Sequence, residues 1–187
     1  MKYDKQLLFN DTSARTPNPM NRELFWQMME ESRDAADGDP FEQSQHLTAA
    51  LAEMLPEDIL EFDALAHDVQ DQAYLAELWE AFYVIEPGCN EEAFVAWRQW
   101  LIGQGRQAFE RALIEPDTLA DLVPADQESG FEVLLGVADE AYAQVTGEIL
   151  PLTLRPARSL RGELHENDAD IFKRFPRLTA KFVTEEE

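Results

Sequence analysis

Apolar residues in the centre of the chain recur every three to four positions, which is the spacing of one face of an α-helix. The pattern occurs four times, and no run before residue 149 alternates as a β-strand would. The four sets are Leu47, Ala50, Leu51, Met54 and Leu55; Phe62, Leu65, Ala66, Val69 and Ala73; Leu75, Leu78, Trp79, Phe82 and Tyr83; and Phe131, Leu134, Leu135, Ala138, Ala141, Tyr142 and Val145. Each set predicts an amphipathic helix whose apolar face packs on a core.

Helix start and stop signals divide the chain further. Capping side chains or prolines suited to the first helical turn precede the apolar runs, and glycines follow them. The start signals are Asn21, Asp39-Pro40, Pro56 and Asn90, and the stop signals are Asp37-Gly38, Pro87-Gly88, Gly103, Gly105 and Gly147. Together they predict an all-α fold: a single-domain helical bundle of about seven helices with short connections.

The 187 residues carry 15 Lys and Arg against 38 Asp and Glu, a formal charge of −23. Residues 1–20 sum to +1, residues 21–150 to −24 and residues 151–187 to zero. A surface with this much negative charge repels phosphate backbones and anionic lipids. We therefore expect neither nucleic acid nor a membrane as a partner. An apolar fraction of 45% is nevertheless too high for a disordered acidic polymer.

The helix signals and the charge map predict three parts. They are a flexible leader at residues 1–20, an acidic all-α domain at residues 21–148, and a C-terminal arm with short helices at residues 149–187. The C-terminal arm carries Arg155, Arg158 and Arg161. We expect these arginines to lie across the acidic domain of the same molecule or of a neighbour, and partly to neutralise it.

The compartment follows from what the chain lacks. A lone cysteine, Cys89, cannot form an intramolecular disulfide. No apolar run approaches the roughly 20 residues that a membrane helix needs. The apolar patch at residues 7–9 is too short for a signal peptide. The expected location is the cytoplasm.

The stretch from Glu86 to Leu122 is the most distinctive in the chain. It reads EPGCNEEAFVAWRQWLIGQGRQAFERALIEPDTLADL. Together with Leu24-Phe25-Trp26, Leu78-Trp79, Ala141-Tyr142 and Thr146-Gly147, it resembles the bacterial proteins grouped as domain-of-unknown-function family number 4240, over roughly residues 20–148. The sequence departs from the family at Asn90-Glu91-Glu92, where a serine and two aspartates are more frequent. The resemblance implies an all-α fold and a bacterial cytoplasmic setting, and it implies no reaction.

Arginines are the only cations of residues 21–150, and three of the five fall between residues 98 and 111. A guanidinium can stack on an indole ring and still bind a carboxylate or phosphate through its planar fork. The candidate pocket for a small anion comprises Arg98, Arg106, Trp97, Trp100, Tyr83 and Glu92. The alternative is that the two arginines form structural ion pairs with Glu92, Glu110 or Asp117, which is the commoner arrangement where carboxylates crowd.

Evidence for catalysis or metal binding is weaker. Cys89 stands just before a predicted helix start, where the helix dipole would lower the pKa of its thiol, but a nucleophile also needs a base. A small buried residue in a tight turn is the simpler interpretation. Neither His46 nor His67 has the Glu-x-x-His spacing of a di-iron bundle. The sequence therefore predicts no catalytic residue, no metal site and no cofactor.

The carboxylates themselves offer one further candidate site. Glu57, Glu61 and Asp68 share one face of a predicted helix. This face could hold a basic protein, such as a toxin bound by an acidic immunity protein or a DNA-binding protein blocked by a phosphate mimic. The alternative is a solvated face that keeps the domain soluble.

The leading functional hypothesis is therefore a bacterial cytoplasmic binding module that acts on a basic protein partner through an acidic surface, in an immunity-like or regulatory role. The alternative is a small-anion-binding protein, or an enzyme, with an Arg/Trp pocket around residues 97–106. The sequence predicts no oligomeric state.

Overall fold

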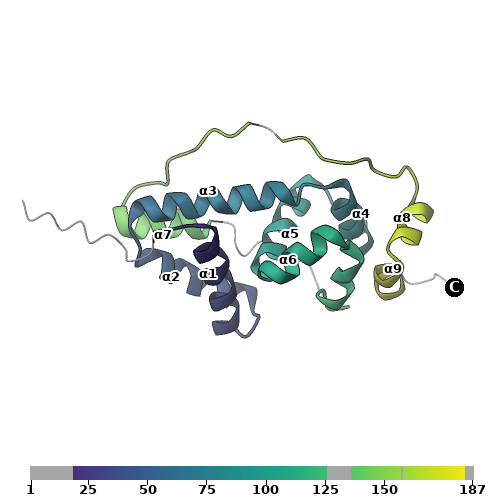
Figure 1. The fold of residues 1–187 in the computed structure, drawn as a ribbon, viewed down its shortest axis with the longest axis horizontal. Helices are drawn as coiled ribbons and strands as arrows, with labels where there is room; N and C mark the ends of the chain where they lie inside the picture. Colours follow the sequence, from purple (N-terminus) through teal and green to yellow (C-terminus); the bar gives the residue numbers. More distant parts are fainter. Residues whose placement is uncertain (1–18, 126–135, 157, 184–187) are drawn as a thin grey trace, which may run out of the picture.

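A computed structural model describes residues 19–125, 136–156 and 158–183, and every regular element within them is a helix (Figure 1). The helices are α1 (Arg22–Ala35), α2 (Pro40–Ala52), α3 (Pro56–Gln72), α4 (Ala76–Ile85), α5 (Glu91–Gly103), α6 (Arg106–Ile114), the 3₁₀ helix η1 (Pro116–Asp121), α7 (Val137–Thr146), α8 (Asp168–Arg174) and α9 (Pro176–Phe182). The predicted all-α, single-domain fold is confirmed. None of the described helices is both long and apolar enough to cross a membrane.

The number of helices differs from the predicted seven. The described residues form ten, because η1, α8 and α9 add elements of only six or seven residues. Two turns are too few for apolar periodicity to reveal a helix. The four helices predicted from periodicity correspond to α2, α3, α4 and α7. Residues 131–135, which belong to the fourth predicted helix, lie outside the described residues.

Side-chain caps explain where the helices begin. Asn21 accepts hydrogen bonds from the amides of Glu23 and Leu24 at 3.0 Å, Asp39 from that of Glu42 at 2.8 Å, and Asn90 from that of Ala93 at 2.8 Å. Each bond satisfies an amide that has no partner within its helix, which stabilises the helix by about 1 kcal/mol. The start signals predicted at Asn21, Asp39 and Asn90 are confirmed, and Pro56 is the first residue of α3.

Aromatic side chains from several helices form the centre of the core. Phe25 of α1 meets Phe62 of α3 with ring centroids 5.1 Å apart, and Phe82 of α4 stacks on Trp97 of α5 at 5.0 Å. All four are at most 1% exposed. The long helix α3 lies along the molecule, with α1, α2 and α7 beside one half and α4 and α5 near its other end (Figure 1). Because helices at both ends of the bundle pack on α3, this helix is the element around which the candidate site residues are arranged.

The C-terminal arm passes along the outside of the domain, from the end of α7 to α8 at the opposite end (Figure 1). Its arginines contact the second half of α3 and the turn that follows it. Arg155 pairs with Asp68 at 3.1 Å, Arg158 pairs with Asp71 at 2.9 Å, and Arg161 donates to the main-chain carbonyl of Gln72. The arginines of the arm thus lie across acidic residues of the same molecule, as the sequence suggested.

A buried carboxylate holds the far end of the arm. Glu80 of α4 is 1% exposed, and its Oε1 lies 2.8 Å from the Nδ1 atom of His165. The other oxygen, Oε2, accepts from Arg174 of α8 at 3.2 Å. Asp117 of η1 accepts the backbone amides of Arg177 and Leu178 at the start of α9. These contacts dock α8 and α9 on α4 and η1.

Candidate functional site

Arg98, the first arginine of the predicted Arg/Trp pocket, is a buried residue of α5 and is only 6% exposed. Its Nη1 donates to the carbonyl of Gln70 at 3.1 Å, and its Nε donates to that of Phe94 at 3.3 Å. The guanidinium lies 4.7 Å from the centroid of the Tyr74 ring. Burial lowers the pKa of Arg98, although the group stays cationic at neutral pH. Arg98 therefore adds a second hydrogen bond to the Gln70 carbonyl, which also accepts from the amide of Ala73. This carbonyl lies in the last turn of α3, where the helix dipole favours a positive charge.

Arg106 lies in a different environment, at the solvent-exposed start of α6. It pairs with Glu110 at 2.8 Å and with Glu23 of α1 at 3.1 Å, and the hydrogen bond that its Nε donates to Glu110 is the main cause that raises the pKa of Arg106. The preceding Gly105 has a φ of +90°, and a Cβ there would lie 3.2 Å from Cγ of Glu30. The close approach at this glycine is thus made by a side chain of α1. For Arg106, the structural ion-pair alternative describes the observed contacts.

The aromatic residues of the predicted pocket belong mostly to the core. Trp97 is fully buried, Trp100 is 6% exposed, and their ring centroids lie 6.3 Å apart. Tyr83 is half-buried, and the nearby carboxylate of Asp168 raises the pKa of its hydroxyl. Arg98 and Arg106 share no partner, because one bonds to carbonyls inside the domain and the other to carboxylates outside. The structure thus favours a supporting role for these residues.

Two further residues near the start of α5 were candidates. Glu92 is exposed in the first turn of the helix. Cys89 is half-buried, and burial raises the pKa of its thiol to about 11. This shift is opposite to the lowering expected from a helix start. At neutral pH the residue is a protonated thiol, which favours its interpretation as a turn residue.

The acidic face predicted on α3 is divided into two halves. Glu57 and Glu61 are exposed in the first half of the helix, and neither has an ion pair within the described residues. Asp68, in the second half, is bound to Arg155 of the arm. The structure thus leaves one half of the predicted face open and fills the other with arginine side chains from the same chain.

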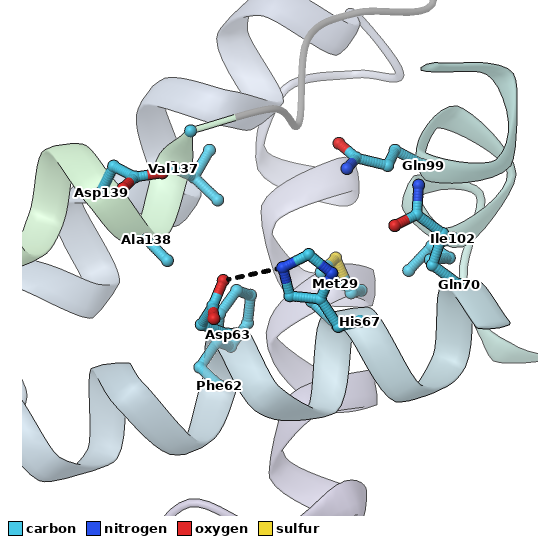
Figure 2. Close-up of a pocket in the computed structure, with 12 residues that line it drawn as sticks. Met29, Phe62, Asp63, His67, Gln70, Gln99, Ile102, Val137, Ala138 and Asp139 are labelled. Carbon is cyan, nitrogen blue, oxygen red and sulfur yellow. Dashed lines mark ion pairs between the residues drawn. The ribbon is translucent and has the colours of Figure 1, made fainter. Parts of the chain in front are cut away.

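A cleft of about 190 Å³ lies between α3, α5 and α7 (Figure 2). Polar side chains from all three helices line it, and apolar side chains form its floor. The polar residues are Asp63, His67 and Gln70 of α3, Gln99 of α5 and Asp139 of α7; the apolar ones include Met29, Phe62, Ile102 and Val137. Asp63 Oδ1 lies 3.6 Å from the Nε2 atom of His67. The cleft therefore combines two carboxylates, those of Asp63 and Asp139, with an apolar floor.

The electrostatics of the cleft favour positive charge. Burial is the main cause that raises the pKa of Asp63; Asp139 raises it further, whereas His67 and Arg155 oppose the shift. On the other side, the Oε1 atom of Gln99 is buried without a hydrogen-bond partner in the described structure. A buried acceptor without a partner is costly, so a donor that entered the cleft would relieve this cost.

The cleft was not predicted from the sequence, although His67 lines it. The available signal was the spacing of Asp63 and His67, which places both on one face of a helix. The opposite wall, around Asp139, comes from a helix far along the chain, so no local pattern could join the two. Within the described ranges, no group of three or more His, Cys, Asp or Glu side chains could hold a metal ion.

Comparison with known proteins identifies a family. No curated protein and no solved structure matches the chain. Residues 20–144, about two thirds of the sequence, match the family model described as "Protein of unknown function (DUF4240)". The matched range runs from the residue before the cap of α1 to the last turns of α7, and so includes both the Arg/Trp segment and the cleft. The chain therefore belongs to the DUF4240 family of proteins of unknown function.

Proposed function

We propose that this chain is a bacterial cytoplasmic binding module that holds a basic, extended segment of a partner protein against the outer face of α3, in an immunity-like or regulatory role. The supporting observation lies within the molecule. The C-terminal arm is itself an extended segment with arginines three residues apart, and two of them pair with Asp68 and Asp71 on this helix. The arm occupies only the second half of the face, so a partner would bind the first half.

The spacing of the carboxylates suits such a segment. Glu57, Glu61 and Asp68 lie on one side of α3 and span roughly 16 Å along its axis. An extended chain covers that distance in about five residues. Two or three basic side chains from one short segment could therefore reach the row, as Arg155 and Arg158 reach Asp68 and Asp71 in the arm.

The charge balance of the domain also supports a basic partner. The few cations of residues 21–150 are largely engaged: Arg98 is buried, while Arg106 and Arg111 hold carboxylates of their own. No described cation neutralises Glu57 or Glu61. Single exposed ion pairs contribute little, so affinity would come from several pairs together, and the negative field would accelerate association.

A peptide-binding measurement tests the proposal. The probe is a fluorescein-labelled peptide with the sequence of residues 151–162, which contains Arg155, Arg158 and Arg161 of the arm, and the readout is fluorescence anisotropy with the full chain. The double variant Glu57→Gln/Glu61→Gln should weaken binding at least about fivefold, because it removes two charges from the open half of the face. Binding by the unaltered chain should also weaken steeply as salt rises from 50 to about 300 mM.

The matched control is the double variant Glu31→Gln/Asp34→Asn, which removes the same charge from the exposed side of α1. This variant should bind the peptide as the unaltered chain does. If both double variants weaken binding equally, the effect is one of net charge, and the proposed site on α3 is wrong.

A further inference from the structure

We propose that the cleft between α3, α5 and α7 binds a small primary ammonium ion carrying a short aliphatic chain. This site is separate from the outer face of α3 discussed above, and it does not depend on a protein partner. Three observations support it: a cavity of suitable size, hydrogen-bond acceptors that face it from three helices, and an apolar floor.

The size of the cleft limits the ligand. A volume of about 190 Å³ corresponds to roughly six water molecules at the 30 Å³ that each occupies in the liquid. Drug-sized ligands generally occupy sites of at least about 300 Å³. The cleft therefore accommodates a small amine, or the end of a longer one, but not a nucleotide or a large ring system.

Three polar side chains of the cleft can accept hydrogen bonds from a ligand. Asp63 and Asp139 supply carboxylate oxygens, and the Oε1 atom of Gln99 is buried with no donor of its own (Figure 2). An ammonium group has three N–H bonds and one positive charge, so it can donate to acceptors on different walls at once. Hydrogen bonds between ionised partners are also shorter and stronger than neutral ones.

The basic side chains near the cleft already face carboxylates. Arg155 is the only arginine whose charge acts on Asp63, and its guanidinium is paired with Asp68 at 3.1 Å. His67 approaches Asp63 only to 3.6 Å, and its imidazole is half-exposed. An anionic ligand would meet two carboxylates and no unpaired arginine among the lining residues, which excludes phosphates and acids as the preferred class.

The apolar residues of the cleft determine the rest of the ligand. Phe62, Ile102 and Val137 are almost fully buried and present carbon atoms to the cavity. A chain of about four carbons would cover them and gain roughly 0.8 kcal/mol for each methylene removed from water. The site therefore discriminates an alkylammonium from a bare ammonium ion.

Titration of the full chain with n-butylammonium chloride, followed by amide NMR shifts, tests the inference. Saturable shifts should appear at residues of the cleft, with a Kd in the millimolar range that is usual for so few atoms. Two ligand controls use 1-butanol, which lacks the charge, and butyrate, which reverses it. Each should bind at least about tenfold more weakly than the ammonium ion.

Two variants test the site from independent directions. Asp63→Asn removes the charge without changing shape and should weaken n-butylammonium binding at least about tenfold. Ala66→Leu fills the cavity without changing any charge and should abolish the shifts. Glu57→Gln, which removes a charge from the exposed face of the same helix, should bind normally, and circular dichroism confirms that each variant is folded.

The outcomes of these experiments either support or overturn the proposed ammonium site. Equal binding of n-butylammonium and 1-butanol, or normal binding by Asp63→Asn, overturns it. A further arm compares n-butylammonium with Nα-acetyl-lysine methylamide. Tighter binding of the lysine derivative identifies a polypeptide side chain as the source of the ammonium group, and weaker binding identifies a free amine. Because Glu57→Gln weakens only the proposed peptide site, failure of one proposal can be told from failure of the other.

Discussion

Two parts of the molecule contrast sharply: the arginines and tryptophans of residues 97–106, and the cleft between α3, α5 and α7, to which the same stretch contributes only Gln99 and Ile102. The first is the most distinctive part of the sequence, yet Trp97 and Arg98 are buried and Arg106 is engaged with Glu23 and Glu110. The second has no motif, yet it gathers carboxylates, an amide and an imidazole around a cavity. Unusual residues thus mark the parts of the fold that must pack in one way, whereas accessible chemistry arises where distant helices meet.

Replacement of Arg98 should produce the largest effect and tests the structural side of this comparison. Arg98→Ala removes the hydrogen bonds to the carbonyls of Gln70 and Phe94 and creates a cavity, so we expect the free energy of unfolding to fall by about 3 kcal/mol. Arg98→Lys retains the charge but loses the planar fork, so its free energy of unfolding should lie between those of the unaltered protein and Arg98→Ala. Urea denaturation measures both. A loss below about 1 kcal/mol for Arg98→Ala would show that the residue is free for a ligand after all.

Gly105 gives the next effect within the same segment. Gly105→Ala places a side chain at a positive φ and brings it close to Glu30, so unfolding free energy should fall by about 1–2 kcal/mol. The double variant Gly105→Ala/Glu30→Ala relieves the contact but not the backbone strain, and should recover only part of the loss. Complete recovery of the unfolding free energy would mean that alanine adopts the positive φ of residue 105 without backbone strain.

Asp63 tests the other side of the comparison, and the expected sign is reversed. Because burial raises the pKa of Asp63 above its ordinary value of 3.8, the folded state binds this proton more tightly than the unfolded state does, and ionisation costs stability. Asp63→Asn should therefore gain up to about 0.5 kcal/mol at pH 7. The gain should shrink as the pH falls through the raised pKa of the folded state and disappear below about 3.8, where the carboxyl is largely protonated in both states. Thermal melts at pH 7 and at about pH 3 measure the difference; a loss at pH 7 would contradict it.

Arg106 should give the smallest effect. Its partners Glu23 and Glu110 are exposed, and such ion pairs contribute little to stability. Arg106→Ala should leave the urea midpoint unchanged within the error of the measurement, in clear contrast to Arg98→Ala. An equally large loss for both arginines would remove the distinction drawn between them.

Local signals sufficed to predict most of the helices. Caps at Asn21, Asp39 and Asn90 involve residues within three positions of each other, so the sequence displays both partners. Short helices were predicted in the C-terminal arm, but the bounds of α8 and α9 were not, because these helices are stabilised by long-range contacts, such as those of Glu80 and Asp117, rather than by their own periodicity.

The candidate sites were harder to predict because burial is a property of the whole fold. Helix α5 is buried on almost every side, from Phe94 to Gly103, so its sequence gives no sign that Arg98 points inward. The cleft requires α7 to pack beside α3, and no pattern near Asp63 specifies that neighbour. The face of Glu57 and Glu61 was identified correctly as exposed, because helical spacing alone defines it.

The two kinds of contact that hold the C-terminal arm imply an order of release. Arg155 and Arg158 bind through solvent-exposed carboxylates, whose attraction fades when dissolved ions screen it, whereas Glu80 is sealed in the domain and screened far less. As ionic strength rises, the arm should lift first at residue 155 while α8 and α9 stay docked. Amide hydrogen exchange would show this as protection lost from one end. Release in this order would expose Asp68 and Asp71 while the arm stays attached to α4.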